Sequence, residues 1–213
     1  MDAEEQARNN MVIKQIENRG ISNQSVLQSI KKVPRHLFVP PAYRHAAYGD
    51  HPLPTSCGQT ISQPYIVALM TELLVPQKHH KALEIGTGTG YQTAILAELV
   101  QEVYTIEIYS QLQETAKNTL TSLGYQNIRF ILGNGYEGYL AAAPYDLILV
   151  TAAPPYLPEN LVEQLALGGT MVIPFGKNRQ MLYVISKNKD GSIHRKEILP
   201  VVFVTMQDRK PLN

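Results

Sequence analysis

The chain has 213 residues, of which 44% are hydrophobic and 17% are charged, and its formal net charge is +1. These values fit a folded α/β domain with a sizeable core and exclude an intrinsically disordered chain. No run of like charge indicates nucleic-acid binding by electrostatics alone, and a single cysteine, Cys57, excludes an internal disulfide.

The first third of the chain is predicted to be mainly helical. Apolar residues at helical spacing predict helices over residues 4–19 and 25–33. Pro34 ends the second helix, and a loop rich in proline and tyrosine runs from there to Thr60. A third helix is predicted to begin at Pro64, because proline suits the first turn of a helix.

From about residue 81 onward, predicted strands and helices alternate. This order favours a mostly parallel sheet with helices on both faces. Two further strands, at 181–186 and 196–204, are joined through a turn at 189–191 and close the sheet as an antiparallel pair. The alternating strands lie near 82–85, 103–107, 128–132, 146–151 and 170–174, and the helices at 91–99, 110–123 and 158–166.

A glycine-rich turn after the first of these strands is the strongest functional signal. Gly86, Gly88 and Gly90 follow an apolar run and precede a helix, so the backbone can turn tightly and approach a ligand. The next strand ends on Glu107, in the position of an acid that accepts both ribose hydroxyls. The G-x-G-x-G spacing, with Glu84 ahead of it, resembles the first motif of class I S-adenosylmethionine-dependent methyltransferases rather than a dinucleotide site.

Two later turns also bear on the ligand. Gly133-Asn134-Gly135 follows the third strand, where Asn134 is expected to meet an adenine edge; an ordinary Asn-Gly turn is the alternative. Residues 151–156 resemble the Asn/Asp-Pro-Pro-Tyr box of methyltransferases that modify base amino groups. Ala153 has no side-chain oxygen to accept an amine, which counts against such a substrate.

The loop at 58–64 has two interpretations. Its hydroxyls, on Thr60 and Ser62, lead into a helix N-terminus and form a surface that suits an anion. Helix capping by Ser62 or Gln63 explains the same residues, and from the residues alone capping is favoured.

Several segments together are similar to one family, the protein-L-isoaspartate (D-aspartate) O-methyltransferases. The similarity extends over about residues 11–206, and its most specific part is Thr60-Ile61-Ser62. It implies a Rossmann-like class I methyltransferase fold in a single domain, 1–213, with a helical N-terminal extension at 1–76 and a core at 77–213. The segments that carry it are 33–40, 58–64, 83–94, 145–153 and 168–174.

The resemblance also implies roles for individual residues. Ser62 matches the active-site serine of the family, and Thr60, Ile61 and Ala152 lie with it on the substrate side. The chain departs from the family by carrying Asn134 in place of the usual Asp and Thr205 in place of the usual Pro. The implied contacts to S-adenosylmethionine are Glu84, Gly86, Thr87, Gly88, Gly90, Glu107, Ile108, Gly133, Asn134, Gly135 and Thr151.

The implied reaction is methyl transfer to the free α-carboxylate of isoaspartyl residues in damaged proteins and peptides. A methyltransferase for another acceptor, such as a small carboxylic acid or RNA, and a non-catalytic cofactor-binding module are the alternatives. The histidines have no metal-ligand spacing, and neither a signal peptide nor about 18 consecutive apolar residues occur. We therefore expect a cytoplasmic monomer with no metal and no nucleic-acid or membrane partner.

Overall fold

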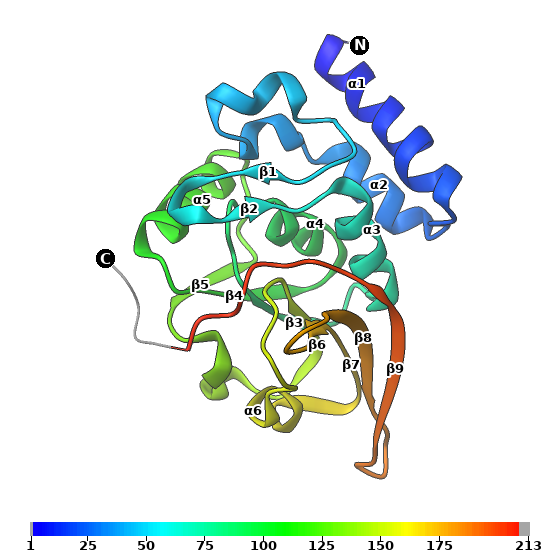
Figure 1. Cartoon of the computed structure of the whole chain (residues 1–213), viewed down its shortest axis with the longest axis vertical. Helices are drawn as coiled ribbons and strands as arrows, with labels where there is room; N and C mark the ends of the chain where they lie inside the picture. The colour runs from blue at the N-terminus through cyan, green and yellow to red at the C-terminus, as the bar shows by residue number, and fades with distance from the viewer. Residues whose placement is uncertain (1, 209–213) are drawn as a thin grey trace.

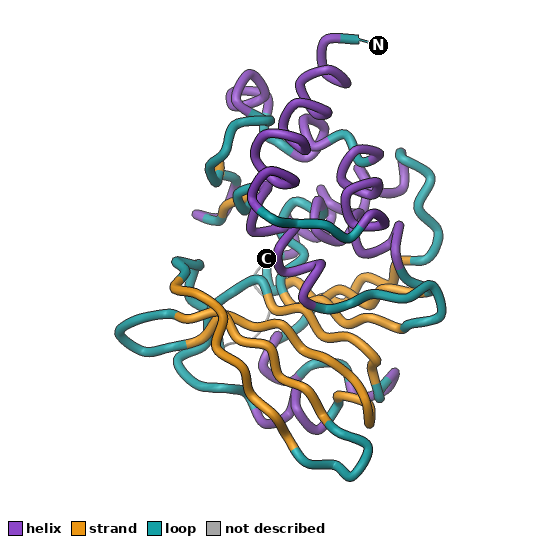
Figure 2. The backbone as a smooth tube through the Cα atoms, turned by 90° about the vertical axis from the view of Figure 1, so that its right-hand side faces the viewer, coloured by secondary structure: helices purple, strands orange, loops and turns teal. Residues whose placement is uncertain are grey.

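A seven-stranded sheet lies at the centre of the molecule, with most helices against one face (Figures 1 and 2). The computed structural model describes residues 2–208. Strand order is β5-β4-β3-β6-β7-β8-β9, parallel from β5 to β7 and antiparallel from β7 to β9. The strands are β3 (Lys81–Ile85), β4 (Glu102–Glu107), β5 (Ile128–Leu132), β6 (Tyr145–Val150), β7 (Leu165–Phe175), β8 (Met181–Lys187) and β9 (Ile193–Pro200). The helices are α1 (Ala3–Met11), α2 (Gln24–Lys32), α3 (Pro64–Leu73), α4 (Tyr91–Leu99), α5 (Ser110–Ser122) and α6 (Glu159–Glu163).

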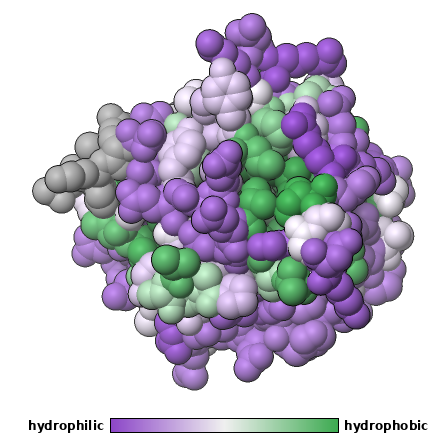
Figure 3. All heavy atoms as spheres, turned by 90° about the horizontal axis from the view of Figure 1, so that it is seen from below, coloured by the Kyte–Doolittle hydropathy of each residue, from purple (hydrophilic) through white to green (hydrophobic). Residues whose placement is uncertain are grey.

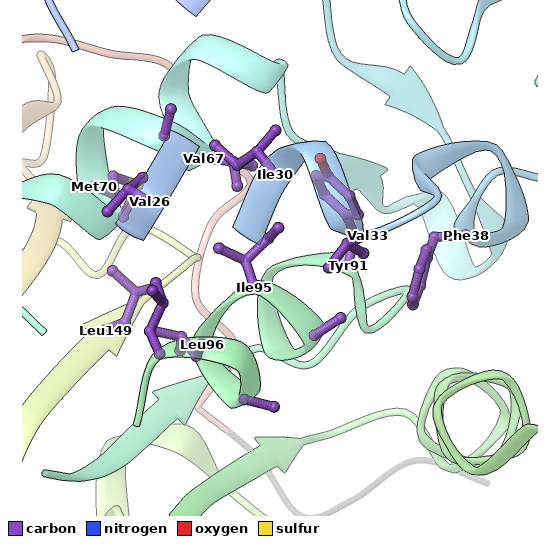
Figure 4. Packing of buried hydrophobic residues seen from close by; sticks show 14 of the residues in the cluster. Val26, Ile30, Val33, Phe38, Val67, Met70, Tyr91, Ile95, Leu96 and Leu149 are labelled. Atoms are coloured by element: carbon purple, nitrogen blue, oxygen red, sulfur yellow. The ribbon is translucent and has the colours of Figure 1, made fainter. Parts of the chain in front are cut away.

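Strand β6 shows how the sheet separates two hydrophobic clusters. Its side chains alternate between the faces, as a strand buried on both sides requires. Leu147 and Leu149 pack in the cluster that contains the buried residues of α2, α3 and α4 (Figure 4). Ile148 and Val150 pack in the second cluster, with Leu161 of α6. The predicted Rossmann-like arrangement, with helices on both faces of a mostly parallel sheet, is confirmed.

The N-terminal helices form because local signals start and stop them. Asp2 caps α1 by accepting a hydrogen bond from the backbone N–H of Glu5 at 2.7 Å. The helix continues as a π-helical and a 3₁₀ segment to Arg19, so the helix predicted over residues 4–19 is found, but only its first part is regular. Asn23 caps α2 in the same way, and Val33 ends it before Pro34.

Several predicted elements differ from the structure, among them the strand expected at 170–174, which is β7 and begins at Leu165. The helix expected at 158–166 stops at Glu163, because Leu165 already pairs with Tyr145 in the sheet. The strand expected at 196–204 occupies Ile193–Pro200 instead. The expected loop before Thr60 contains 3₁₀ turns, of which the first is Arg35–Phe38, and a small antiparallel pair, β1 (Leu53–Pro54) with β2 (Thr60–Ile61).

After β9 the chain leaves the sheet and turns back across the molecule (Figure 1, red). Ala153 holds this segment: its N–H donates to Val204 and its carbonyl accepts from Met206. Thr205 therefore lies in a parallel bridge with Ala153. Seen from below, the surface is mostly hydrophilic around a central apolar area (Figure 3). Within residues 2–208 the structure has no helix with the length and apolar character that crossing a membrane requires.

Candidate active site

The glycine turn between β3 and α4 has a backbone conformation that favours glycine at two positions. Gly86 and Gly88 have positive φ angles of 94° and 55°, which favour glycine. A Cβ on Gly86 would lie 2.4 Å from the Thr151 hydroxyl, whereas a Cβ on Gly88 would project into open space. The Thr151 hydroxyl is fixed there because it hydrogen-bonds the carbonyl oxygens of Ile85 and Gly86, at 2.9 and 2.8 Å.

Glu107, at the end of β4, lies beside this turn. Its carboxylate accepts hydrogen bonds from three backbone N–H groups, those of Gly88, Ile108 and Tyr109, at 2.8, 2.8 and 3.0 Å. Only 5% of the residue is exposed. Burial raises the pKa of this carboxyl, and the backbone N–H groups oppose that rise. The acid that the sequence places at the second strand tip is thus rigidly oriented.

Glu84, on β3, lies underneath the glycine turn. It is fully buried at 0% exposure, and its Oε2 accepts from the hydroxyls of Thr93 and Thr105 at 2.5 and 2.6 Å. The Thr105 hydroxyl also bonds that of Thr87 at 2.7 Å. Burial raises the pKa of Glu84 to about 8. The sequence led us to expect direct contact between Glu84 and the cofactor. Its buried position favours instead a role in supporting the glycine turn from below.

A pocket opens at the carboxyl ends of β3 and β4, between the glycine turn, the β2–α3 loop and the C-terminal segment. All the predicted cofactor and acceptor residues line it except Glu84, Gly90 and Asn134. Gly90 faces α5 and not the pocket, since a Cβ on Gly90 would lie 2.9 Å from the side chain of Leu120. The fold therefore brings the two predicted halves of the site, residues 60–62 and the glycine turn, to one pocket.

Ser62 lies between β2 and α3, on the wall of the pocket opposite the glycine turn. Gln63 occupies the N-cap position of α3, and no side chain caps this helix. The Gln63 side chain donates instead to Asp50. The capping interpretation of Ser62 is therefore wrong. Its carbonyl oxygen accepts a hydrogen bond from Arg35 at 2.8 Å.

Asn134 lies at the edge of the site. Its side-chain oxygen accepts from the N–H of Tyr136 at 3.0 Å, and its side-chain nitrogen donates to Asp208 at 3.0 Å. Its neighbours Gly133 and Gly135 line the pocket, but Asn134 itself does not. Contact between Asn134 and an adenine edge stays a prediction.

Several parts of the pocket wall were not identified from the sequence, among them Val67 and Met70 of α3. Tyr91, the first residue of α4, lines it and is only 1% exposed. Residues 203–207 form another side, where a regular strand was expected for the first two. Thr205, one of the two departures from the family, lies in this segment, and no local pattern indicates that the chain returns across the sheet there.

The pocket fits an adenosine-type cofactor. Open space at Gly88 leaves room for a ligand against the backbone. The Glu107 carboxylate is an acceptor for sugar hydroxyls, and Ile106 and Ile108 on either side of it supply an apolar wall. Within residues 2–208, no group of three or more His, Cys, Asp or Glu side chains is placed to hold a metal ion.

Comparison with known proteins assigns the family. The sequence model of protein-L-isoaspartate(D-aspartate) O-methyltransferases matches residues 6–211. A protein-L-isoaspartate O-methyltransferase from Picosynechococcus sp. is 49% identical over 200 residues, which cover 94% of this chain and 90% of that protein.

Solved structures agree with the sequence comparison. One protein-L-isoaspartate O-methyltransferase gives a TM-score of 0.83 at 28% identity, over 94% of this chain and 66% of that chain. A Plasmodium falciparum protein assigned the same activity, in complex with S-adenosyl-L-homocysteine, gives 0.82 at 26% identity over 94% and 98%. On these matches and on the site geometry, the chain belongs to the protein-L-isoaspartate (D-aspartate) O-methyltransferase family.

Proposed function

We propose that this protein transfers a methyl group from S-adenosylmethionine to the α-carboxylate of L-isoaspartyl residues in proteins and peptides. The observation that carries the proposal is a single pocket with two unlike walls. One wall is the glycine turn with Glu107, suited to the cofactor, and the other is Thr60-Ile61-Ser62, suited to an acceptor. Family membership supports the same cofactor and the same acceptor.

The chemistry needs no general base. Carboxylic acids of this kind titrate near about 4, so the acceptor is already ionised at neutral pH. S-adenosylmethionine supplies a methyl group activated by its sulfonium. A bond forms between the acceptor oxygen and the methyl carbon as the bond from that carbon to sulfur breaks. The electron pair of the broken bond stays on sulfur. What the protein supplies is alignment of acceptor oxygen, methyl carbon and sulfur, together with exclusion of water.

Among the pocket-lining residues within the described range 2–208, Glu107 is the only one with a charged side chain. The Ser62 hydroxyl and nearby backbone N–H groups are uncharged donors suited to orienting an acceptor carboxylate. Glu107 lies on the other wall, where its charge attracts the cofactor rather than opposing the acceptor.

The product of this reaction explains its use in repair. Methylation turns the carboxylate into an ester that can lose its methoxy group, so the neighbouring backbone nitrogen attacks the ester carbonyl, a C–N bond forms as the C–O bond to the methoxy group breaks, and methanol leaves as the succinimide ring closes. Opening of that ring regenerates normal aspartate in part of the molecules. The protein needs no further residue for these steps, because they are spontaneous.

The test is methylation of matched synthetic peptides that differ only in one residue, isoaspartate or aspartate. We expect far faster methyl-ester formation on the isoaspartyl peptide, because the two carboxylates differ in distance and direction from the main chain. Equal rates, or turnover only on small carboxylic acids or RNA, would assign another acceptor. Cofactor binding without turnover on any of these would make the protein a binding module. The expectations of a monomer and of a cytoplasmic location stay predictions.

A further inference from the structure

Arg35 is a buried cation that the proposed reaction does not use directly. It lies in the 3₁₀ turn that follows α2 and is 0% exposed. No carboxylate within residues 2–208 forms an ion pair with it. Desolvation lowers its pKa, but only to about 10, so the guanidinium stays charged at neutral pH.

The contacts of Arg35 join three separate segments. Its Nε donates to the carbonyl of Ala47 and its Nη2 donates to the carbonyl of Ser62, both at 2.8 Å. Its guanidinium carbon lies 4.8 Å from the centroid of the Tyr91 ring. Two of these partners, Ser62 and Tyr91, line the pocket, although Arg35 does not.

The environment of Tyr91 fixes this arrangement further. Its ring packs edge-on against Phe38, with centroids 5.6 Å apart, and Val33 lies close by (Figure 4). Phe38 and Arg35 belong to the same short turn. Through this four-residue turn the N-terminal extension therefore contacts two parts of the pocket wall. One is Tyr91, which directly follows the glycine turn, and the other is Ser62, which precedes α3.

This cation is costly if packing is its only role. Removing a charge from water without an ionic partner carries a desolvation penalty, whereas an apolar side chain of similar length would fill the space without that penalty. The Arg35 Nη1 is buried and has no partner at good hydrogen-bond geometry within residues 2–208, although the guanidinium and the buried Tyr91 hydroxyl interact favourably. Arg35 supplies a charged hydrogen bond that restrains the Ser62 peptide just before α3.

We propose that Arg35 is a positioning residue for the acceptor: by holding the carbonyl of Ser62 it fixes the direction of the Ser62 hydroxyl. This inference rests on the proposed function. Arg35 itself touches neither the cofactor nor the acceptor. A loosened Ser62 peptide would misplace the acceptor while the glycine turn and Glu107 still bind the cofactor.

The experiment compares Arg35→Met and Arg35→Lys with the wild type. For the isoaspartyl peptide we expect kcat/KM to fall about ten- to hundredfold in Arg35→Met, the range that loss of one charged hydrogen bond or a small misplacement produces. Arg35→Lys should recover part of the lost kcat/KM, because an ammonium group can reach the carbonyl of either Ala47 or Ser62. Affinity for S-adenosylhomocysteine, measured by calorimetry, should stay within about twofold of the wild type.

Arg8→Met is the matched control. The Arg8 Nε donates to the carbonyl of Lys31 at 2.5 Å and so joins α1 to α2, away from the pocket. Arg8 also acts electrostatically on Tyr91 but has no contact with Ser62, so Arg8→Met should lower the melting temperature and change kcat/KM per folded molecule far less than Arg35→Met does. The double variant Arg35→Met/Ser62→Ala should be little worse than Ser62→Ala alone, because both changes remove the same orienting group.

Three results would overturn the proposal. The first is wild-type kcat/KM in Arg35→Met and Arg35→Lys. The second is parallel loss of cofactor binding and turnover in both, which is the signature of a folding residue. The third is full additivity with Ser62→Ala. A wild-type enzyme that fails on the isoaspartyl peptide would instead refute the proposed function.

Discussion

The Glu107 carboxylate and the backbone N–H of Gly88 are joined by a hydrogen bond of 2.8 Å. This bond links the tip of β4 to the middle of the glycine turn. The group expected to bind the cofactor sugar therefore also fixes the loop that the cofactor lies against. Sugar binding and loop order are coupled through one carboxylate.

Replacing Glu107 with Ala should weaken binding of S-adenosylhomocysteine by about 1.5–3 kcal/mol for each charged hydrogen bond lost. Calorimetry measures the change. Glu102→Ala is the control, because Glu102 begins the same strand and pairs with Arg129 at 3.0 Å away from the pocket. Equal affinity of wild type and Glu107→Ala would remove Glu107 from the cofactor site.

Replacing Ser62 with Ala should lower kcat on the isoaspartyl peptide much more than it lowers cofactor affinity. Stability should change little, since Ser62 does not cap α3. Ser62→Thr should retain part of the activity, and Ser56→Ala, in the exposed turn before β2, is the matched control. Wild-type turnover of Ser62→Ala at saturating cofactor would contradict an orienting role.

Asn134 and Asp208 allow a test by charge exchange. The Asn134 amide donates to the Asp208 carboxylate at 3.0 Å, and Asn134→Asp replaces this hydrogen bond with repulsion between two carboxylates. We expect the repulsion to displace the turn at 133–135 and so to weaken binding of S-adenosylhomocysteine. Adding Asp208→Asn should restore it, because the amide and the carboxylate have then exchanged places. If Asn134→Leu binds as tightly as the wild type, the turn has no part in cofactor binding.

Glu84 should make stability depend on pH. Its pKa is raised from its ordinary value of 4.5 to about 8, so between these values the folded protein keeps a proton that the unfolded chain has lost. The free energy of unfolding should therefore fall as pH rises through this range, by up to about 1.4 kcal/mol per pH unit from this group. Above about pH 8 this contribution is lost.

Urea unfolding of Glu84→Gln at several pH values from 5 to 9 tests this. The amide oxygen can still accept from Thr93 and Thr105, and the fall with pH should be smaller than in the wild type. The exposed Glu114→Gln on α5 should behave as the wild type does. Identical pH profiles for wild type and Glu84→Gln would show that Glu84 is ionised in the folded protein.

Local signals explain what could be predicted from the sequence. The parallel strands, the glycine turn and the helix at 91–99 each have a pattern that is contained within a few residues, and α4 begins and ends where expected. Strand pairing overrides such signals at Leu165, where a helical pattern gives way to the register with Tyr145. At the site, most of the residues predicted near strand tips line one pocket, whereas Asn134 does not, and their contacts to a cofactor stay predictions.

Contacts between distant segments explain what could not be predicted. The hydrogen bond from Arg35 to Ser62 spans 27 residues, and nothing in either segment marks the other as its partner. Burial of Glu84 beneath the turn depends on Thr93 and Thr105, which lie on other elements. The return of residues 203–207 depends on pairing with Ala153, and no local pattern in either segment marks the other as its partner.

The outer edge strand β9 bears on how the protein behaves among damaged chains. Its residues 193–197 are exposed and include His194, Arg195, Lys196 and Glu197. Charged side chains on an edge strand discourage pairing with another strand, and Pro200 at its end removes one donor. An enzyme that works on aged, partly opened proteins meets many unpaired strands. The charged residues of β9 therefore disfavour edge-to-edge pairing with such strands at this side of the sheet.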